Sequence, residues 1–381
     1  MRVAMIGDYP PPGRRVSGGV ERVIDTLASE LTRSLAVTVV VPNSAEAATE
    51  RIHGFDVVHL RRLPLPGVLR YWTFEALALS RVVRLLRADI VHIHGPAGWG
   101  MWMKTPCVVT VHGIPHRDIN FSWGRSFRWL KAAMMKPLER IARRNCGNII
   151  VINDYVLDEL PDVGVLPHQL IRNPVDRRFL VAPRHTAAGA ERRLITVGTV
   201  CPRKNALGIL QLFAVLAKID PTVTLAVCGE VTDRVYGDAC LRFIAAEGLS
   251  CRVALLGNLG MDDLVREYDR SSLLLILSHQ ETAPMVAAEA LVRGLPIAAP
   301  PTFGLRNMIG HGVNGIHLKS STEAGRALEI VAALDRCFDR NAIAAMAAKL
   351  YAPERVAALT LDFYHRVLAH GRSSRRKGVR P

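Results

Sequence analysis

Apolar residues in the first half of the chain form short runs that alternate with amphipathic stretches. The runs are rich in β-branched residues, which favours buried strands, and residues 20–31 and 73–86 repeat apolar positions at helical spacing. Short buried strands that alternate with helices are typical of a parallel, doubly wound sheet. The predicted strands cover residues 3–6, 37–41, 57–60, 90–94, 107–111 and 149–152.

The alternation stops at residues 173–192, whose proline, small and charged residues are typical of a linker between domains. It then resumes, with predicted strands at 194–197, 224–228, 253–256, 273–277 and 296–299. The predicted helices cover residues 206–218, 261–271, 284–293, 323–333 and 353–369. The sequence therefore predicts an α/β protein with two Rossmann-like domains facing a cleft, over residues 1–178 and 193–352. We expect a terminal helix at 353–370, which can pack back on the N-terminal domain, and a disordered basic tail at 371–381.

Length, composition and charge limit the kinds of partner that the chain is expected to bind. The 381 residues are too many for most single cores, and 49% apolar residues exclude general disorder. Forty-nine Lys and Arg against 34 acidic residues give a net charge of +15, which favours a polyanionic partner. The chain has no zinc-finger spacing and no basic, aromatic-rich RNA-binding motif. We therefore expect a phosphorylated substrate or an anionic membrane surface rather than nucleic acid.

Cysteine usage and hydropathy indicate the compartment. The seven cysteines are scattered, odd in number and without a Cys-x-x-Cys pair, which predicts reduced thiols in a cytoplasmic protein. The apolar run at the N-terminus is too short for a signal peptide and reads as a strand. No stretch reaches about 18 apolar residues, so no segment is expected to span a bilayer.

The densest chemical signal is the segment 278–297, which carries two glutamates. Glu281 follows a predicted strand on a loop, and Glu289 lies inside the helix that Pro284 is suited to begin. Carboxylates accept hydrogen bonds from sugar hydroxyls, and the first amides of a helix, here those of Met285 and Val286, bind phosphate. The alternative is an ordinary strand–loop–helix unit with surface glutamates.

Two adjacent cations, Arg203 and Lys204, are expected to open a helix directly after a strand. Beside free helix amides they can hold a pyrophosphate without a metal ion, although an exposed basic pair at a helix start is the simpler alternative. The chain has no Asp-x-Asp pattern for a metal–diphosphate pair. Gly18 and Gly19 follow the first strand and a proline-rich loop. They either let amides approach a ligand or form a plain turn before a helix.

Histidines end two predicted strands. His112 lies at the end of the strand 107–111, at the edge of the sheet where ligands bind in open α/β folds, and a structural hydrogen bond is the alternative. His92 and His94 are spaced to share one face of a strand, as metal ligands would be. No third ligand is evident, and a structural role is favoured for both.

Several segments, in order and spacing, together resemble the retaining family 4 glycosyltransferases of GT-B fold. Two glutamates separated by seven residues, the second of which begins Glu289-Ala-Leu-x-x-Gly-Leu-Pro-Ile, resemble the family signature. Six shorter elements resemble other family motifs. They are Gly18-Gly-Val-Glu-Arg, Asp89-Ile-Val-His-Ile-His-Gly, Thr110-Val-His-Gly, Asn173-Pro-Val-Asp, Val197-Gly-Thr-Val-Cys-Pro-Arg-Lys-Asn and Gly312-Val-Asn-Gly.

The resemblance implies a glycosyltransferase that moves a sugar from a nucleotide-diphosphate sugar to a saccharide or lipid-linked acceptor, with retention and without a metal or other cofactor. It implies that Glu281 contacts the transferred sugar, that Glu289 binds the ribose hydroxyls, and that His112 contacts the donor sugar or acts at the reacting centre. It places Gly198, Arg203 and Lys204 at the donor diphosphate. Gly18 and Gly19 are placed near the diphosphate and the acceptor.

Three elements depart from the family pattern, at four positions. Thr282 stands where many relatives have glycine, and Pro284 removes an amide from the expected phosphate-binding turn. Phe303 and Asn307 replace a glycine and an acid of the usual Gly-Gly-x-x-Glu element. These departures leave two alternatives open: a catalytically weak nucleotide-sugar-binding protein and a GT-B nucleotide-sugar epimerase.

Residues 121–145 combine apolar positions at helical spacing with basic residues. The apolar positions are Trp123, Phe127, Leu130, Met134, Leu138 and Ile141. A basic amphipathic helix with tryptophans can lie on an anionic membrane, whereas a core-facing stripe with a solvated basic back is the alternative. Residues 63–74 add a second apolar and basic stretch. We therefore hypothesise that the N-terminal domain touches the inner face of a membrane and takes a lipid-linked acceptor.

Overall fold

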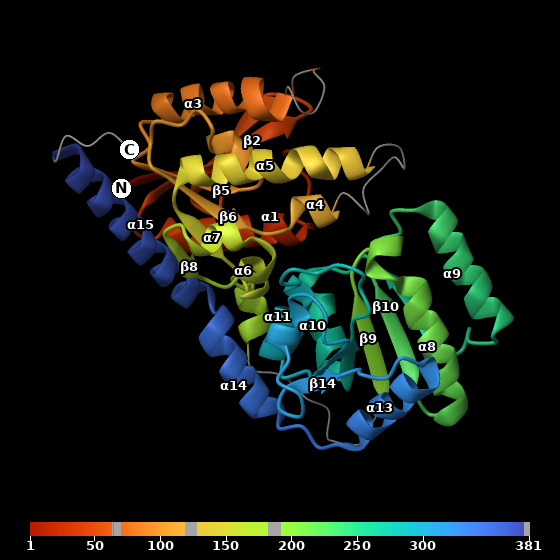
Figure 1. The fold of residues 1–381 in the computed structure, drawn as a ribbon. Coiled ribbons are helices and arrows are strands. Elements are labelled where there is room, and N and C mark those ends of the chain that lie inside the picture. The colour runs from red at the N-terminus through yellow and green to blue at the C-terminus, as the bar shows by residue number, and fades with distance from the viewer. Residues whose placement is uncertain (63, 65–69, 119–127, 182–191, 377–381) are drawn as a thin grey trace. The chain divides into compact units, whose positions relative to one another are not determined.

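The computed structural model describes residues 1–62, 64, 70–118, 128–181 and 192–376 (Figure 1). The chain divides into two compact units. The first unit comprises Met1–Pro174 and Pro353–Pro381, and the second comprises Val175–Ala352. Each unit is built on a largely parallel sheet with helices, as the alternating sequence pattern predicts. Residues 182–191 of the predicted linker lie outside the described residues.

The first unit holds an eight-stranded sheet in the order β3-β4-β2-β1-β5-β6-β7-β8. All described neighbours are parallel except β3, which pairs antiparallel with β4. The strands are β1 Arg2–Gly7, β2 Ala36–Ser44, β3 Ala48–Ile52, β4 Phe55–Arg61, β5 Ile90–His94, β6 Cys107–Val111, β7 Ile149–Val151 and β8 His168–Leu170. The hydrophobic pattern did not predict β3 and β8, because neither edge strand carries a buried apolar run.

Helices pack on this sheet, and the last one returns from the far end of the sequence. They are α1 Gly19–Leu31, α3 Glu75–Leu85, α4 Pro115–Asp118, α5 Arg128–Cys146, α6 Tyr155–Glu159, α7 Pro161–Gly164 and α15 Pro353–Arg376, with a π-helical turn η1 Arg70–Phe74 and a 3₁₀ turn η2 Ala97–Gly100. Val356, Phe363 and Tyr364 of α15 join the same core cluster as Val3 of β1 and Ile24 of α1. The helix continues to Arg376, past the end at residue 369 that the sequence pattern predicted.

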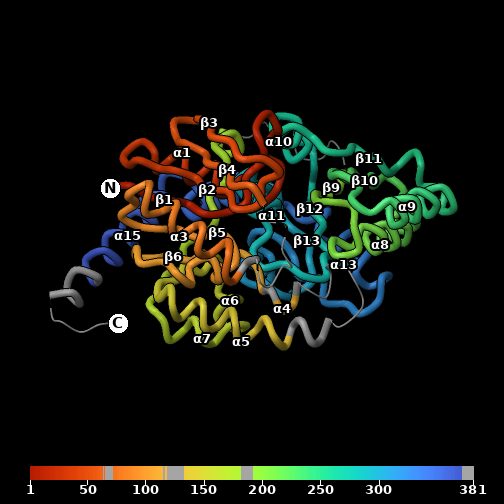
Figure 2. The backbone as a smooth tube through the Cα atoms, turned by 90° about the horizontal axis from the view of Figure 1, so that it is seen from above, coloured from red at the N-terminus to blue at the C-terminus, as the bar shows by residue number. Residues whose placement is uncertain are grey.

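The second unit holds a six-stranded parallel sheet in the order β11-β10-β9-β12-β13-β14. The strands are β9 Arg193–Val197, β10 Thr224–Cys228, β11 Val253–Gly257, β12 Leu273–Leu275, β13 Ile297–Ala299 and β14 Gly315–His317. The chain moves from β9 to β10 on one side and later returns to β12 on the other (Figure 2). Strand order therefore reverses at β9, the place where doubly wound sheets bind ligands.

The helices of the second unit follow its strands along the chain. They are η4 Arg177–Leu180, η5 Pro202–Lys204, α8 Ala206–Ile219, α9 Arg234–Ala246, α10 Met261–Arg270, α11 Met285–Val292, α12 Leu305–Met308, α13 Glu323–Asp335 and α14 Arg340–Tyr351. The sequence pattern missed α9 and α14. The signal that would have found them is local, because Asp233 and Asp339 each cap the helix that follows by accepting a backbone N–H.

Candidate functional site

A pocket lies in the second unit at the carboxyl ends of β9 and β12. Its position is the point where strand order reverses, which is where doubly wound sheets bind ligands. Of the predicted site residues, it brings together Gly198, Lys204, Glu281 and Val286. The other lining residues are Thr196, Val197, Thr199, Val200, Ala206, Ile209, Val227, Ile276, Leu277 and Ser278.

The loop after β9 shapes one wall of this pocket. Gly198 has a φ of +146°, a conformation that favours glycine, and its amide donates to the Cys228 carbonyl at 2.9 Å. Arg203 and Lys204 do not open the following helix as the sequence suggested. They lie in the 3₁₀ turn η5, and Asn205, with a φ of +58°, separates that turn from α8. The left-handed conformation of Asn205 ends the turn and lets a new helix begin.

Two cations converge on one carboxylate beside the pocket. The Lys204 Nζ atom lies 2.5 Å from Oε1 of Glu281, and Nη1 of Arg203 lies 3.9 Å from Oε2 of the same carboxylate. The Glu281 side chain is only 7% exposed, whereas Arg203 is 37% exposed. One buried carboxylate thus stands against two positive charges, which leaves a net positive charge available for an anion.

The loop that carries Glu281 is fixed on several sides. The His279 amide donates to the Arg203 carbonyl at 2.9 Å, and the Gly304 amide donates to the Glu281 carbonyl at 3.1 Å. Phe303, immediately before Gly304, has a φ of +52°. The residue that replaces a glycine of the family pattern therefore keeps a glycine-like backbone conformation. These bonds tie the backbone of the Glu281 loop to Arg203 and to Gly304.

Helix α11 begins at Met285, and Pro284 is its N-cap residue. Pro284 therefore takes no amide from the first turn, because the helix starts one residue later than the sequence suggested. Pro284 provides no side-chain cap hydrogen bond, so within the part of the chain that the structure describes the N-cap residue does not satisfy the first amides of α11, those of Met285 and Val286. Val286 lines the pocket, whereas Met285 and Glu289 are not among the lining residues.

Glu289 is buried within the second unit. Glu289 is 1% exposed, and its Oε2 atom accepts a hydrogen bond of 3.1 Å from the Tyr268 hydroxyl of α10. Tyr268 is itself fully buried. The two glutamates of the signature therefore differ in their surroundings. Glu281 lines the pocket, whereas Glu289 is buried against Tyr268 and does not line it.

Gly18 and Gly19 belong to the first unit and form the start of α1. Gly18 is the N-cap residue, and the Glu21 carboxylate accepts from the amides of Ser17 and Gly18 at 3.1 and 2.9 Å. A Cβ atom on Gly18 would lie 3.1 Å from the Glu21 carboxyl carbon. The glycine therefore leaves room for this capping carboxylate, while its φ of −71° is open to any residue.

The three predicted histidines of the first unit lie together. His94 Nδ1 is 2.9 Å from His112 Nε2, and His94 Nε2 is 3.3 Å from His92 Nδ1. Burial lowers the pKa of His92 to about 3 and that of His112 to about 4, and it lowers the pKa of His94 well below its usual value. All three rings are therefore neutral at pH 7, and they are bonded to one another rather than separate.

The two halves of the chain match two family models. Residues 17–179 match Glycosyltransferase Family 4, and residues 181–347 match Glycosyl transferases group 1. A D-inositol 3-phosphate glycosyltransferase of Nocardioides sp. is 30% identical over 98% of this chain and 91% of its own length. The chain belongs to the family 4 glycosyltransferases.

Further relatives agree with this assignment. A GDP-mannose-dependent alpha-mannosyltransferase of Mycobacterium tuberculosis is 24% identical over 91% of each chain. The Anabaena protein HepE, solved in complex with UDP and glucose, superposes with a TM-score of 0.72 at 16% identity over 95% of this chain and 99% of its own. The glycosyltransferase therefore has the Rossmann-like domains of the GT-B fold.

Residues that the sequence pattern did not single out support the site of this glycosyltransferase. Tyr268 contacts Glu289, and Asn205 both ends η5 and donates to the Leu277 carbonyl at 3.1 Å. Asn205 could have been found, because asparagine is enriched in the left-handed conformation. Thr110 and Tyr364 contact His92 at 2.6 Å each, and Tyr364 gave no local signal because it lies 272 residues away along the chain.

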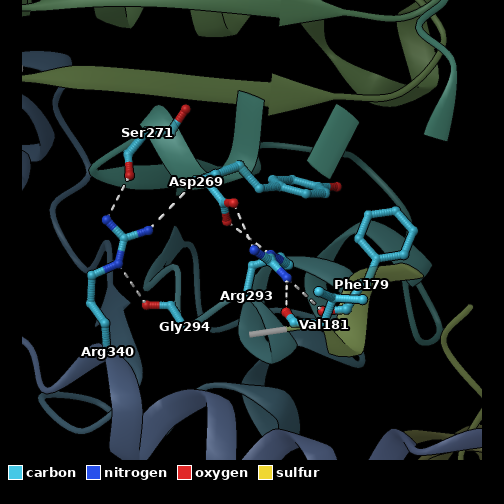
Figure 3. A network of polar contacts seen from close by, with 8 residues as sticks. Phe179, Val181, Asp269, Ser271, Arg293, Gly294 and Arg340 are labelled. Carbon is cyan, nitrogen blue, oxygen red and sulfur yellow. Dashed lines mark hydrogen bonds and ion pairs between the residues drawn. The ribbon is translucent and has the colours of Figure 1, made fainter. Parts of the chain in front are cut away.

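A buried ionic network holds α11 in place (Figure 3). Arg293, directly after α11, donates to both oxygens of Asp269 at 2.8 and 2.6 Å and to the Phe179 and Val181 carbonyls. Arg340 donates to the carbonyls of Gly294 and Ser271 at 3.2 and 3.0 Å. The network ties the C-terminal end of α11, the helix that follows Glu281, to α10 and α14.

Proposed function

We propose that this glycosyltransferase moves its sugar with retention at the anomeric carbon and without a metal ion. The observation that carries the proposal is the convergence of Lys204 and Arg203 on Glu281 beside the uncapped start of α11. Two fixed cations and free helix amides can neutralise a leaving diphosphate, which is the charge that develops in the transition state. The protein thus has its own substitute for a bound cation.

The pair of Lys204 and Glu281 suggests how the donor is taken. The diphosphate draws the Lys204 ammonium away from the carboxylate, because the phosphate oxygens carry more negative charge. Glu281 is then released to accept hydrogen bonds from hydroxyls of the transferred sugar. The same event therefore binds the leaving group and prepares the sugar contact.

Retention follows a front-face course in this proposal. The acceptor hydroxyl attacks the anomeric carbon on the side from which the diphosphate leaves, the bond from that carbon to the diphosphate oxygen breaks, and the departing phosphate takes the hydroxyl proton. The protein orients the reactants and stabilises charge, so it needs no second carboxylate as nucleophile. Glu289 is assigned to the ribose hydroxyls, held by Tyr268, and His112 to the donor sugar. Gly198 and the amides of Met285 and Val286 are assigned to the diphosphate.

A ligand screen followed by a product analysis tests the proposal. Nucleoside diphosphates and their sugars are added in EDTA, and a ligand that binds the folded state raises the melting temperature. The panel includes uridine and guanosine diphosphates and their sugars, since one relative is a GDP-mannose-dependent mannosyltransferase and HepE was solved with UDP. NMR of the product with a saccharide acceptor then reports the anomeric configuration. Inversion or a requirement for a divalent metal would contradict the proposal.

The departures at Phe303 and Asn307 leave two other functions to be tested, those of a catalytically silent binding protein and of a nucleotide-sugar epimerase. A catalytically silent binding protein would bind the nucleotide sugar yet release no nucleoside diphosphate with any acceptor. A nucleotide-sugar epimerase would consume the donor in the absence of an acceptor. Following donor and product in the same assay, with and without acceptor, separates the three outcomes.

We also propose that the first unit contacts an anionic membrane and takes a lipid-linked acceptor on the cytoplasmic side. No helix among the described residues is long and apolar enough to cross a bilayer. On α5, Met134 and Ile141 of the predicted apolar stripe are 49% and 55% exposed, while Glu139 and Arg143 are buried. Trp123 and Phe127 lie outside the described residues. Met134 and Ile141 therefore do not face the core, while Leu138 between them is half-buried.

Charge and further apolar exposure on the same unit support the membrane proposal. Lys136, Arg140 and Arg144 of α5 are exposed beside Met134 and Ile141. Phe74 and Leu77, at the start of α3, are 49% and 52% exposed. Exposed apolar side chains among basic residues are typical of helices that lie on anionic lipid.

Flotation with vesicles of phosphatidylglycerol and phosphatidylcholine tests the membrane contact. The wild type is expected to float at low salt, and the double variant Met134→Ser/Ile141→Ser is expected to lose most of this binding. Leu328→Ser in α13 of the second unit is the matched control, since Leu328 is 58% exposed on a different unit. Absence of wild-type flotation, or equal flotation of the double variant and the control, would contradict the proposal.

A further inference from the structure

A buried chain of hydrogen bonds leads from the C-terminal helix to His112. The Tyr364 hydroxyl of α15 lies 2.6 Å from His92 Nδ1, and His92 Nε2 lies 2.6 Å from the Thr110 hydroxyl. From His92 the chain passes to His94 at 3.3 Å and on to His112 at 2.9 Å. Tyr364, His92, His94 and Thr110 are between 0% and 4% exposed, so bulk water does not satisfy these groups.

The proton order along this chain follows from the donors at its two ends. Burial raises the pKa of Tyr364, so the phenol stays protonated, and each imidazole carries one proton because burial lowers its pKa. Among the described residues the Tyr364 hydroxyl has one partner, His92 Nδ1. A phenol is a stronger donor than an aliphatic hydroxyl, and an imidazole nitrogen is a good acceptor. Tyr364 therefore donates to Nδ1, and His92 donates from Nε2 to Thr110.

The remaining bonds then have a single direction. His92 Nδ1 has no proton, so His94 must carry its proton on Nε2, which faces that atom. His94 Nδ1 is then an acceptor, and His112 must donate to it from Nε2. A neutral histidine has only one N–H, so Nδ1 of His112 is left as a hydrogen-bond acceptor.

In the reverse order, every ring would carry its proton on the other nitrogen. Thr110 would donate to His92, and the last ring, His112, would carry its proton on Nδ1. The Tyr364 hydrogen would then face the N–H of His92 and have no acceptor among the described residues. A buried donor without a partner is costly, so the tyrosine selects the first order.

We propose that Tyr364 is a positioning residue, which acts through His92 and His94 to fix His112 as the Nε2–H tautomer with Nδ1 as an acceptor. The inference rests on the proposed function for its catalytic consequence, since His112 is assigned there to the donor sugar. A fixed acceptor selects sugar orientations that present a hydroxyl hydrogen to His112 and disfavours those that present a lone pair. The helix from the far end of the sequence would therefore set the proton position of the histidine that is assigned to the donor sugar.

Histidine NMR on the full chain tests the tautomer without any substrate. Two-bond proton–nitrogen spectra of ¹⁵N-histidine protein report which nitrogen of each ring is protonated, and His112→Gln assigns the His112 signals. The wild type is expected to show His112 protonated at Nε2. Tyr364→Phe removes the donor that selects this order, and Thr110→Val leaves the Nε2–H of His92 without its acceptor, so both are expected to show protonation of His112 at Nδ1 in a measurable fraction.

Two matched controls separate tautomer control from general loss of structure. Thr110→Ser retains the hydroxyl and is expected to keep the wild-type His112 spectrum. Tyr9→Phe removes another buried tyrosine hydroxyl of the first unit, bonded to Asp25 at 2.6 Å, and is also expected to keep it. If Tyr364→Phe does not fold, Thr110→Val against Thr110→Ser still decides the question.

Kinetics then test the consequence for transfer. Tyr364→Phe is expected to lower kcat about tenfold with the acceptor KM unchanged, a size typical of one misoriented hydrogen bond. A wild-type His112 protonated at Nδ1, or a wild-type spectrum in both Tyr364→Phe and Thr110→Val, would overturn the inference. Normal kcat in a variant whose tautomer has shifted would overturn the catalytic role alone. Failure of the proposed function would appear instead as absence of transfer by a wild type with the expected spectrum.

Discussion

Nζ of Lys204 lies 2.5 Å from Oε1 of Glu281, so the cation assigned to the diphosphate is paired with the carboxylate assigned to the sugar. If Lys204 binds the diphosphate and Glu281 the sugar, as proposed, the two parts of the donor are recognised together. A ligand that supplies only the diphosphate would have to separate the pair, while a complete nucleotide sugar would offer a partner to each. The proposed roles therefore predict that Glu281 opposes diphosphate binding and assists sugar binding.

This opposition predicts two effects of opposite sign for Glu281→Gln. The amide keeps the shape of the side chain but no longer neutralises Lys204, so affinity for a free nucleoside diphosphate is expected to rise about threefold to tenfold, typical of a partly exposed ion pair. The rate of transfer is expected to fall, because the sugar loses a charged acceptor. Calorimetry and a transfer assay measure the two effects.

Asp335→Asn is the control for this charge change. It removes one negative charge from the same unit, at a pair with Arg192, and neither residue lines the pocket. It is expected to change neither quantity by more than about twofold, because exposed charges are screened by salt. Weaker diphosphate binding by Glu281→Gln would contradict the opposed roles of the pair.

Gly198→Ala is expected to disturb the loop that leads to Lys204. A new Cβ would have room, at 3.5 Å from Lys204 Cδ, so the penalty arises from the φ of +146°. We expect a loss of about 1–3 kcal/mol in stability and at least about tenfold weaker diphosphate binding. Gly248→Ala, at a φ of +66° with open space around it, is the matched control. It is expected to lose stability and retain binding, and equal binding by both variants would contradict a role for the loop.

Tyr268→Phe is expected to separate the ribose contact from the diphosphate contact. It removes the 3.1 Å bond to Glu289 and leaves a buried carboxylate oxygen without that donor, which costs about 1–3 kcal/mol. Affinity for a nucleoside diphosphate is expected to fall severalfold, while affinity for inorganic pyrophosphate is unchanged. Tyr351→Phe, a buried tyrosine of α14, controls for the loss of a hydroxyl. An equal loss of affinity for the nucleoside diphosphate and for pyrophosphate would contradict the assignment of Glu289 to the ribose hydroxyls.

Acid is expected to destabilise the first unit. In the folded chain the pKa of His92 is about 3, below the usual 6.5, and the pKa of His94 is also lowered. At a pH below 6.5 and above the folded pKa of each ring, the unfolded chain therefore binds more protons than the folded chain. The free energy of unfolding therefore falls as pH drops below about 6.5, by up to about 1.4 kcal/mol per pH unit for each histidine.

Urea unfolding followed by tryptophan fluorescence measures this effect in the intact chain. All five tryptophans precede residue 174, so the signal reports the first unit. Stability is expected to be lower at pH 5.0 than at pH 7.5, with a smaller difference in His94→Asn and an unchanged difference in the exposed-histidine control His168→Asn. Equal stability at the two pH values would contradict the neutral, buried state of these rings.

The sequence predicted those parts of the site that depend on local order along the chain. Glu281 follows a strand, and Arg203 and Lys204 follow another, and neighbouring parallel strands bring such loops to one edge of the sheet. The pairing of these residues across 77 positions could thus be expected from the fold class. The short turn η5 was not predicted, because it depends on the left-handed conformation of Asn205.

Features that depend on packing between distant segments could not be predicted. The burial of Glu289 depends on Tyr268 of another helix, and the position of His92 depends on Tyr364 of α15. On α5, the apolar stripe has helical spacing whether it faces the core or the solvent. The buried face includes Glu139 and Arg143, because Arg143 bonds both oxygens of Asp162 at 3.0 and 2.9 Å.

Calorimetric titration of a nucleoside diphosphate in EDTA, with wild type and Lys204→Met side by side, tests whether the cations of the protein replace a metal ion. The wild type is expected to bind without any metal, and Lys204→Met is expected to bind about 100-fold more weakly, the loss expected for one desolvated charge-assisted contact to phosphate. Undiminished binding by Lys204→Met, or wild-type binding that disappears in EDTA, would contradict this role of the cations.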